Sequence, residues 1–204
     1  LRANAATILA DNARAGWTAR LAEPSAGGVL AGILARTGTL QVTDWQPPGP
    51  LQQHLVAAWW YQNGKQQAWL VLSGYVPPSL ARTLRGMLAT ALTDAACYVG
   101  SCGGAPFLFA GDWNSLRTEL ALDSLWQRGW TDLSDRPTSL DAAGQPARRI
   151  DLMLASDAVQ RATHGFTVDW TCGLPQHAVQ ELLIAPPAPQ CYRQWSPTPT
   201  VHTQ

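Results

Sequence analysis

Two apolar, aromatic-rich runs on either side of a turn are the feature that most limits how this chain can fold. The segment HLVAAWWYQNGKQQAWLVLSGYV, residues 54–76, carries these runs around the pair Asn63-Gly64. An Asn-Gly pair readily adopts the positive φ angles of a tight hairpin turn and is therefore a strong sign of two antiparallel strands. The runs are also far too short to span a bilayer. We therefore predict a β-hairpin within a globular domain.

Helices and further strands are expected around this hairpin. Residues 78–100 begin with Pro-Ser, end at a glycine and place apolar side chains on one face of a helix. A second amphipathic helix is predicted over 115–129, with Ser115 as its N-cap and Gly129 as its stop. The face of the first of these helices is expected to carry Leu80, Leu84, Met87, Leu88, Ala91, Leu92 and Ala95. A short helix over 3–13 and strands over 27–35, 105–113, 148–156 and 176–185 complete the prediction.

A hairpin embedded in alternating strands and helices predicts an α/β (α+β) sandwich with mixed sheets, not a doubly wound parallel sheet. The 204 residues suit one domain, and 46% hydrophobic with 14% charged residues is globular composition. We assign residues 1–185 to this domain and 186–204 to an irregular, Pro-rich tail. Residues 1–20 do not resemble a secretion signal, so a nuclear or cytoplasmic location is expected over secretion.

Charge and cysteine content narrow the function classes. Fourteen basic and fourteen acidic residues give a net charge of zero, and Lys65 is the one lysine. This balance counts against tight, non-specific binding of DNA through its phosphates, which needs an excess of basic residues. The four cysteines match no zinc spacing, and we predict mostly buried thiols rather than disulfides. They are Cys97, Cys102, Cys172 and Cys191.

Polar side chains recur at the ends of the expected strands. In FLFAGDWNS, residues 107–115, Asp112 and Asn114 are two residues apart and would face the same side of a strand. Tyr75 and Asp151 are part of other expected strands, and His177 begins the last one. A carboxylate can orient a water or bind a metal, while amide, phenol and imidazole groups can hydrogen-bond a phosphate as charge builds on it. Together they suit hydrolysis of a phosphodiester.

Each of these residues also has an ordinary structural interpretation. Asp-x-Asn after a strand is common turn chemistry. Asp151 can pair with Arg148 or Arg149, and His177 can be a structural histidine. Tyr75 can be a core aromatic with its hydroxyl at the rim. For Trp113, packing is expected over a place in a substrate cleft.

In their order and wording, the motifs resemble the endonuclease/exonuclease/phosphatase superfamily, which includes abasic-site endonucleases and the endonuclease domains of non-LTR retrotransposons. GDWN is similar to its Gly-Asp-x-Asn signature, RRIDLMLAS to its Arg-Ile-Asp strand, and PQHAVQ stands in the place of its Ser-Asp-His motif. The retrotransposon type is suggested by GW at 16–17, GGVLAGIL at 27–34 and YVPPS at 75–79. The resemblance covers residues 1–185 and implies a four-layer sandwich of two mixed β-sheets flanked by helices.

The resemblance also implies a role for each residue. Asp112 would orient or deprotonate the attacking water, and Asn114 would position that water and bind the phosphate. Tyr75 would contact the phosphate. Asp151 would hold the site in shape or support the histidine, and His177 would bind a phosphate oxygen and stabilise the transition state. The family typically uses Mg²⁺, which prefers oxygen ligands; Asp151 is a further candidate ligand here.

Two departures from the family pattern lower the expected activity. The family's metal-binding Glu should fall at or just before Leu1, so we expect a fragment that lacks the first strands and the principal metal ligand. Glu23 lies beside Pro24 in an expected loop and is not expected to replace it. The family's Asp before the histidine is Gln176 here. A neutral amide can orient the imidazole, but it adds no charge to stabilise its protonated form.

The expected function is that of a magnesium-dependent phosphodiester hydrolase, specifically a DNA endonuclease of retrotransposon type. Water would attack phosphorus in line, without a covalent intermediate. Little or no activity is expected from the chain as it stands. Its partners would be DNA or another phosphodiester, and a downstream reverse transcriptase region in a longer polypeptide, with no membrane. Two alternatives remain: a non-catalytic relic or interaction module on the same fold, and a phosphomonoesterase acting on a sugar or lipid headgroup.

Overall fold

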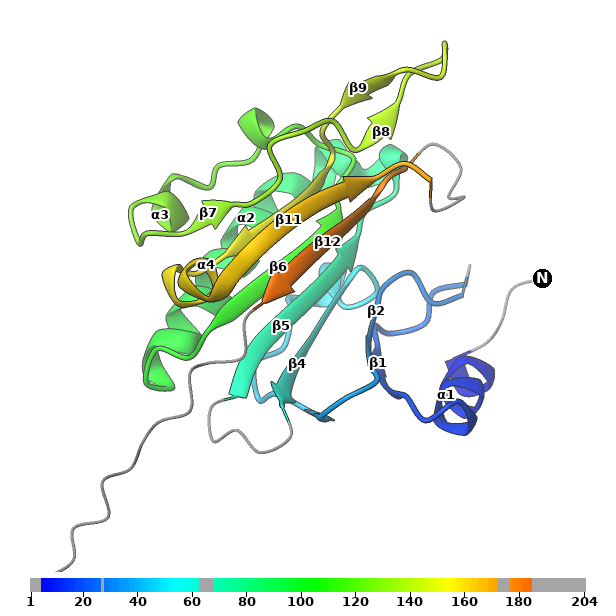
Figure 1. Cartoon of the computed structure of the whole chain (residues 1–204), viewed down its shortest axis with the longest axis vertical. Helices are drawn as coiled ribbons and strands as arrows, with labels where there is room; N and C mark the ends of the chain where they lie inside the picture. The colour runs from blue at the N-terminus through cyan, green and yellow to red at the C-terminus, as the bar shows by residue number, and fades with distance from the viewer. Residues whose placement is uncertain (1–4, 27, 63–67, 172–176, 185–204) are drawn as a thin grey trace, which may run out of the picture.

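A six-stranded mixed sheet forms the centre of the protein (Figure 1). The structure, a computed structural model, describes residues 5–26, 28–62, 68–171 and 177–184. Within the sheet, β5 and β6 run parallel and every other neighbouring pair is antiparallel. In spatial order its strands are β3 (Thr39–Gln41), β4 (Leu55–Tyr61), β5 (Ala68–Tyr75), β6 (Phe107–Asp112), β10 (Asp151–Ala155) and β7 (Thr131–Asp132).

The predicted hairpin is β4 and β5. The two strands pair from Leu55 opposite Gly74 to Tyr61 opposite Ala68, which confirms the prediction. The turn pair Asn63-Gly64 lies outside the described residues. From β5 the chain passes through the long helix α2 (Pro78–Ser101) and returns as β6 beside β5. A parallel pair needs such a crossover, and this one places the ends of β5 and β6 at the same sheet edge.

Helix α2 covers one face of the sheet, where the main hydrophobic core lies. Leu70 and Leu72 of β5 and Phe107 and Phe109 of β6 are fully buried in one cluster with the helix. The apolar stripe of α2 is close to the predicted one, but Leu80 is 39% exposed. The first buried residue of α2 is Ala81 rather than Leu80. Ala81 is in helical register with the residues that meet the sheet, which are Leu84, Leu88, Ala91, Leu92 and Ala95.

Trp113 packs beneath the end of β5 and β6. Its side chain is 1% exposed, and its ring centroid lies 4.8 Å from that of Phe109. The absence of side chains at Gly74 and Gly111 makes the room: a Cβ at Gly74 would lie 2.4 Å from the indole carbon Cη2. The packing role expected for Trp113 is confirmed.

Two-stranded ribbons make up the rest of the β structure. The ribbon of β1 (Thr18–Leu21) and β2 (Gly32–Ala35) packs Ile33 into a second core cluster against β3 and β4. The ribbon of β11 (Thr163–Asp169) and β12 (Val179–Ile184) lies on the viewer's side of the sheet in Figure 1, with α2 behind. The other described elements are α1 (Ala5–Arg14), α4 (Asp157–Ala162), β8 (Ser139–Leu140), β9 (Pro146–Arg148) and a 3-10 turn at Gly49–Leu51. The predicted α/β architecture is confirmed, with one mixed sheet and small antiparallel ribbons among the described residues.

Several local predictions are wrong. The strand expected over 27–35 begins only at Gly32. The helix expected over 115–129 is instead a 3-10 turn at Arg117–Glu119 and the single turn α3 (Asp123–Trp126). Tertiary packing overrides the helical pattern. Leu120 has an extended backbone, and this break in the helix lets the leucines at 120, 122 and 125 all be buried in the main core. Helix α3 ends at Trp126 with Gln127 as its C-cap, and Gly129, at φ +77°, lies in the turn that follows it.

The two cysteines that the structure describes, Cys97 and Cys102, are exposed free thiols, so the prediction of buried thiols is wrong for them. Cys97 lies near the end of α2, outside its buried stripe, and Cys102 is the C-cap residue of the helix. Cys172 and Cys191 lie outside the described residues. Across the described part of the chain, no helix combines the length and apolar character needed to cross a membrane.

The contact between Gly74 and Trp113 predicts a stability effect. Gly74→Ala should lower the free energy of unfolding by about 1–3 kcal/mol, because the added methyl group overlaps the indole ring. The matched control is Gly86→Ala in α2, where nothing lies within 4 Å of the new Cβ. It should raise the free energy of unfolding by about 0.5–1 kcal/mol through helix propensity. Urea denaturation of both variants checks this; equal effects would contradict the packing described.

Candidate active site

A row of three polar side chains crosses the sheet where β5 and β6 end. Tyr75 pairs with Asp112 in the parallel register, and Asp112 pairs with Asp151 in the antiparallel one. Residues directly opposite each other on paired strands point to the same face. Their chain neighbours on β6 and β10 belong to the α2 side, where Leu152 is fully buried. The row therefore faces away from α2.

His177 lies between the two carboxylates of this row. Its Nδ1 is 3.2 Å from Oδ2 of Asp151, and its Nε2 is 3.8 Å from Oδ2 of Asp112. The histidine side chain is 32% exposed and both aspartate side chains are 15% exposed, so a ligand can reach them from one side. Because Asp151 contacts His177, the alternative pairing of Asp151 with a neighbouring arginine is wrong. Arg149 pairs with Asp132 instead, at 2.8 Å.

Asn114 takes part both in a local turn and in the site. Its backbone N–H donates to Oδ1 of Asp112 at 3.0 Å, which is the expected turn chemistry. Its φ of +46° lies in the left-handed region, which asparagine tolerates better than most residues. This conformation directs the side chain across to the end of β5, where Nδ2 donates to the carbonyl of Val76 at 2.9 Å. The amide therefore lies next to the Tyr75 end of the row.

Burial and charge alter the protonation of Asp112. Burial, followed by the negative charge of Asp151, raises the pKa of the Asp112 carboxyl from 3.8 to about 6. The Asn114 N–H and His177 act in the opposite direction, because each favours the ionised form. Asp112 is thus a stronger base than an ordinary aspartate and is still ionised at neutral pH.

The same three side chains form a group that can hold a metal ion. One ligand atom each from Asp112, Asp151 and His177 lies within 4.8 Å of the others. Two carboxylates that repel each other at a partly buried site would be stabilised by a cation, and carboxylate oxygens suit a hard divalent ion. The residues present therefore fit such an ion. Glu23 is exposed and belongs to no such group among the described residues.

One histidine outside the sequence motifs supports the row from its edge. His54 is buried; its carbonyl accepts the Tyr75 N–H at 2.9 Å and its Nδ1 lies 3.0 Å from the Tyr75 carbonyl. In the hairpin, Leu55 pairs with Gly74, so the next pair along places His54 opposite Tyr75. Gln176, predicted to weaken the site, lies outside the described residues.

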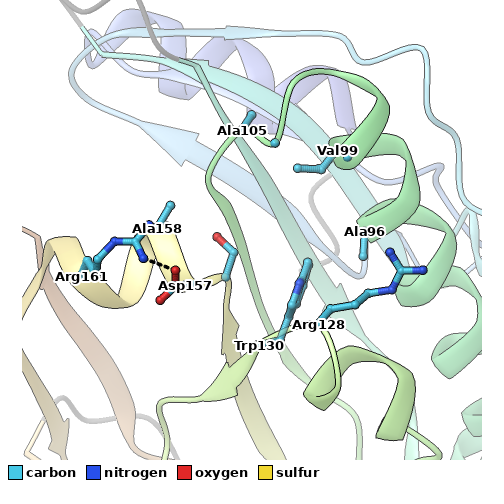
Figure 2. Close-up of a pocket in the computed structure, with 11 residues that line it drawn as sticks. Ala96, Val99, Ala105, Arg128, Trp130, Asp157, Ala158 and Arg161 are labelled. Atoms are coloured by element: carbon cyan, nitrogen blue, oxygen red, sulfur yellow. Dashed lines mark hydrogen bonds and ion pairs between the residues drawn. The ribbon is translucent and has the colours of Figure 1, made fainter.

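A separate cavity of about 270 Å³ lies at the other end of β6, beside Phe107 rather than Asp112 (Figure 2). Arg161 pairs with Asp157 at one side of this cavity, and Arg128 lies beside Trp130 at the other. The cavity lining holds one carboxylate and no histidine. It therefore lacks the acid–base groups of the row and is not the hydrolytic site. Its remaining lining residues are Ala96, Val99, Gly100, Gly104, Ala105, Ser156 and Ala158.

Comparison with known proteins identifies the fold. No family model and no curated protein sequence matches the chain. Among solved structures it is similar to the 3'-5' exonuclease NExo from Neisseria meningitidis, with a TM-score of 0.67, 20% identity, and coverage of 91% of this chain and 86% of that one.

It is also similar to the endonuclease domain of TRAS1, a telomere-specific non-LTR retrotransposon, with a TM-score of 0.63, 17% identity, and coverage of 83% and 80%. For an AP endonuclease from Archaeoglobus fulgidus the TM-score is 0.60 and the identity 15%, with coverage of 86% and 82%. The chain therefore has the fold of the endonuclease/exonuclease/phosphatase superfamily, as the motifs predicted.

The raised pKa of Asp112 predicts a pH-dependent stability. Its folded-state pKa of about 6 lies above the ordinary 3.8, so its stabilising contribution is complete below 3.8 and is lost as pH rises to 6. In metal-free buffer at pH 8, Asp112→Asn should therefore raise the free energy of unfolding, by about 2–3 kcal/mol. Urea denaturation between pH 4 and pH 8 should show this difference growing with pH up to about 6. The exposed Asp157→Asn is the control, and an Asp112→Asn difference independent of pH would contradict the burial described.

Proposed function

We propose that this chain is a phosphodiester hydrolase that acts on DNA, specifically an endonuclease of retrotransposon type that uses Mg²⁺. The observation that carries the proposal is the convergence of Asp112, Asp151 and His177, with Asn114 and Tyr75 beside them, at one edge of the sheet. These groups can activate a water, bind a phosphate and stabilise the charge that develops on it. They come from strands that are far apart in sequence, which ordinary turn chemistry does not require.

Asp112 is the base in this proposal. A general base works best when its pKa is near the working pH, and the pKa of this carboxyl is raised toward that range. Oδ1 already accepts the Asn114 N–H, so the side chain is held in one orientation. Asn114 uses one amide hydrogen for the Val76 carbonyl, which leaves its second amide hydrogen and its oxygen for the water and the phosphate.

His177 is the phosphate-binding group. A carboxylate can only accept, so the Nδ1 of His177 donates its hydrogen to Asp151, and this contact fixes the ring orientation. Nε2 then faces the Asp112 side of the site. In the protonated ring this nitrogen donates to a phosphate oxygen and stabilises the negative charge of the transition state. Tyr75, next to Asp112 in the row, offers a phenol hydroxyl for the same phosphate.

The site residues also favour a divalent cation. Asp151 would hold Mg²⁺, which proteins often bind through one or two carboxylates and the substrate phosphate, while Asp112 beside it remains the base. When bound, the ion supplies Lewis-acid stabilisation of the phosphoryl oxygens. The two carboxylates also repel each other less beside a cation, which favours the ionised form of Asp112 that the proposed role requires.

DNA as the substrate is supported by the nature of the similar structures. These include the endonuclease domain of a retrotransposon, an AP endonuclease, and NExo described as a 3' phosphatase bound to a product DNA hairpin. The last of these also favours a second candidate, removal of a terminal phosphate by the same groups. The net charge of zero predicts that either substrate is recognised locally rather than through an extended basic surface.

A nicking assay tests the proposal. With protein in excess over supercoiled plasmid and Mg²⁺ present, the chain should convert plasmid to the nicked form, at the low rate that its departures from the family pattern predict. Asp112→Asn should lower the rate about 10²–10⁴-fold because the proposed base is lost. Asp157→Asn should nick like the unaltered protein, since this exposed residue lies beside the other cavity. Chelation of Mg²⁺ should abolish nicking in all three.

Parallel reactions on a 3'-phosphorylated oligonucleotide and on inositol phosphates separate the alternatives. Release of inorganic phosphate without nicking would favour a phosphomonoesterase. Absence of both reactions would contradict the proposal and favour a non-catalytic module. Equal nicking by Asp112→Asn would remove Asp112 from the role of base.

A further inference from the structure

We propose that Thr138 is a positioning residue that sets the place of His177 relative to Asp151. The inference rests on the proposed function and adds a residue to its machinery. Thr138 lies between β7 and β8 and is fully buried, with 0% of the residue exposed. A buried threonine must satisfy its hydroxyl group, so its hydrogen-bond partners indicate what the residue holds in place.

The hydroxyl of Thr138 binds the start of β10. Its Oγ1 accepts the backbone N–H of Ile150 at 3.3 Å and that of Asp151 at 3.2 Å. A hydroxyl oxygen has two lone pairs, so one side chain can serve both amides. The backbone N–H of Thr138 donates in addition to the carbonyl of Arg148, at 2.8 Å. Thr138 thus fixes the backbone from residue 148 to Asp151.

The carbonyl of Thr138 binds the segment that carries His177. It accepts the N–H of Ala178 at 2.9 Å, and the next residue, Ser139, forms a β-bridge with His177. One buried residue therefore contacts the backbone on both sides of the Asp151–His177 pair. Its side chain holds the carboxylate strand, and its main chain holds the histidine.

Such a link is needed because Asp151 begins a strand of the central sheet, whereas His177 lies outside that sheet, just before β12. The sheet ladder fixes Asp151 against Asp112, but β12 belongs to the separate β11–β12 ribbon. The described contacts that join the two segments are those of the Thr138 region, the His177–Asp151 contact itself, and one bond from Nε2 of Gln180 to the Asp151 carbonyl at 3.2 Å. Loss of the Thr138 hydroxyl frees the start of β10 from Thr138 and leaves the main-chain bonds of the Thr138 region, the His177–Asp151 contact and Gln180 to join the two segments.

Removal of the Thr138 hydroxyl leaves a second attachment of the chain just before β10 intact. Arg149 binds Asp132 at 2.8 Å and also donates to the Ser134 carbonyl, so the chain before β10 remains attached to β7. Valine has the shape of threonine but no acceptor, so Thr138→Val leaves two amide hydrogens without a partner. Thr138→Ser keeps the acceptor. The control is Thr163→Val, which loses a hydroxyl that donates to the Val159 carbonyl at 2.9 Å, outside the Thr138 contacts.

The test combines NMR with the nicking assay. In ¹⁵N-labelled, metal-free protein, the His177 Nδ1 resonance should move toward that of a free imidazole in Thr138→Val. It should stay unchanged in Thr138→Ser and Thr163→Val. The nicking rate should fall about 10–100-fold in Thr138→Val, as it does when groups that orient a site residue are lost, and should stay within about threefold in the other two.

Several outcomes decide the matter. An unchanged Nδ1 resonance in Thr138→Val, or an equal change in Thr163→Val, overturns the inference. If Thr138→Val does not fold, amide exchange in the unaltered protein decides instead: slow exchange at Ile150 and Asp151 supports the inference, and fast exchange overturns it. A shifted resonance in a protein that nicks no DNA supports the positioning role while contradicting the proposed function.

Discussion

Two carboxylates that repel each other lie side by side in this protein, and His177 and the Asn114 N–H act by lowering the energy of that repulsion. Asp112 and Asp151 are opposite each other across β6 and β10, in a partly buried place where neither is fully hydrated. The pKa of Asp112 rises in response, and His177 lies between the two. A pair of buried acids costs stability, so its presence at the edge of a well-packed sheet is more easily explained by chemistry than by structure.

The layer beneath the pair is closely packed. Trp113 packs against Gly74 and Gly111, the strand neighbours of Tyr75 and Asp112, on the side of the sheet that α2 covers. The ladder between β5, β6 and β10 then fixes three of the site residues without further help. His177 is different, because it arrives on a separate ribbon and depends on side-chain and loop contacts for its position. The position of His177 relative to the other site residues therefore depends on a few buried hydrogen bonds and not on the sheet.

Sequence reasoning succeeded where the periodicity of a strand settles the geometry. The hairpin and β6 follow from runs of apolar residues with strand periodicity. The place of Asp112 at the end of β6 follows from the apolar run that stops at Gly111. It failed over 115–129, where leucine spacing fits a helix but burial against the sheet requires a broken path. It also missed Thr138, since a buried hydroxyl that binds a distant backbone leaves no pattern in the chain. The convergence of the site residues was inferred through the family resemblance, not from periodicity.

The central claim is that one phosphate group is held among side chains brought together from separate strands and ribbons. A crystal structure with Mg²⁺ and a short DNA carrying a slowly hydrolysed phosphorothioate tests this most directly. The modified phosphate should lie against Asp112, Asn114 and His177, on the face of the sheet opposite α2. A phosphate bound elsewhere, for example at the cavity between Arg128 and Arg161, with the carboxylate row left free, would contradict the claim.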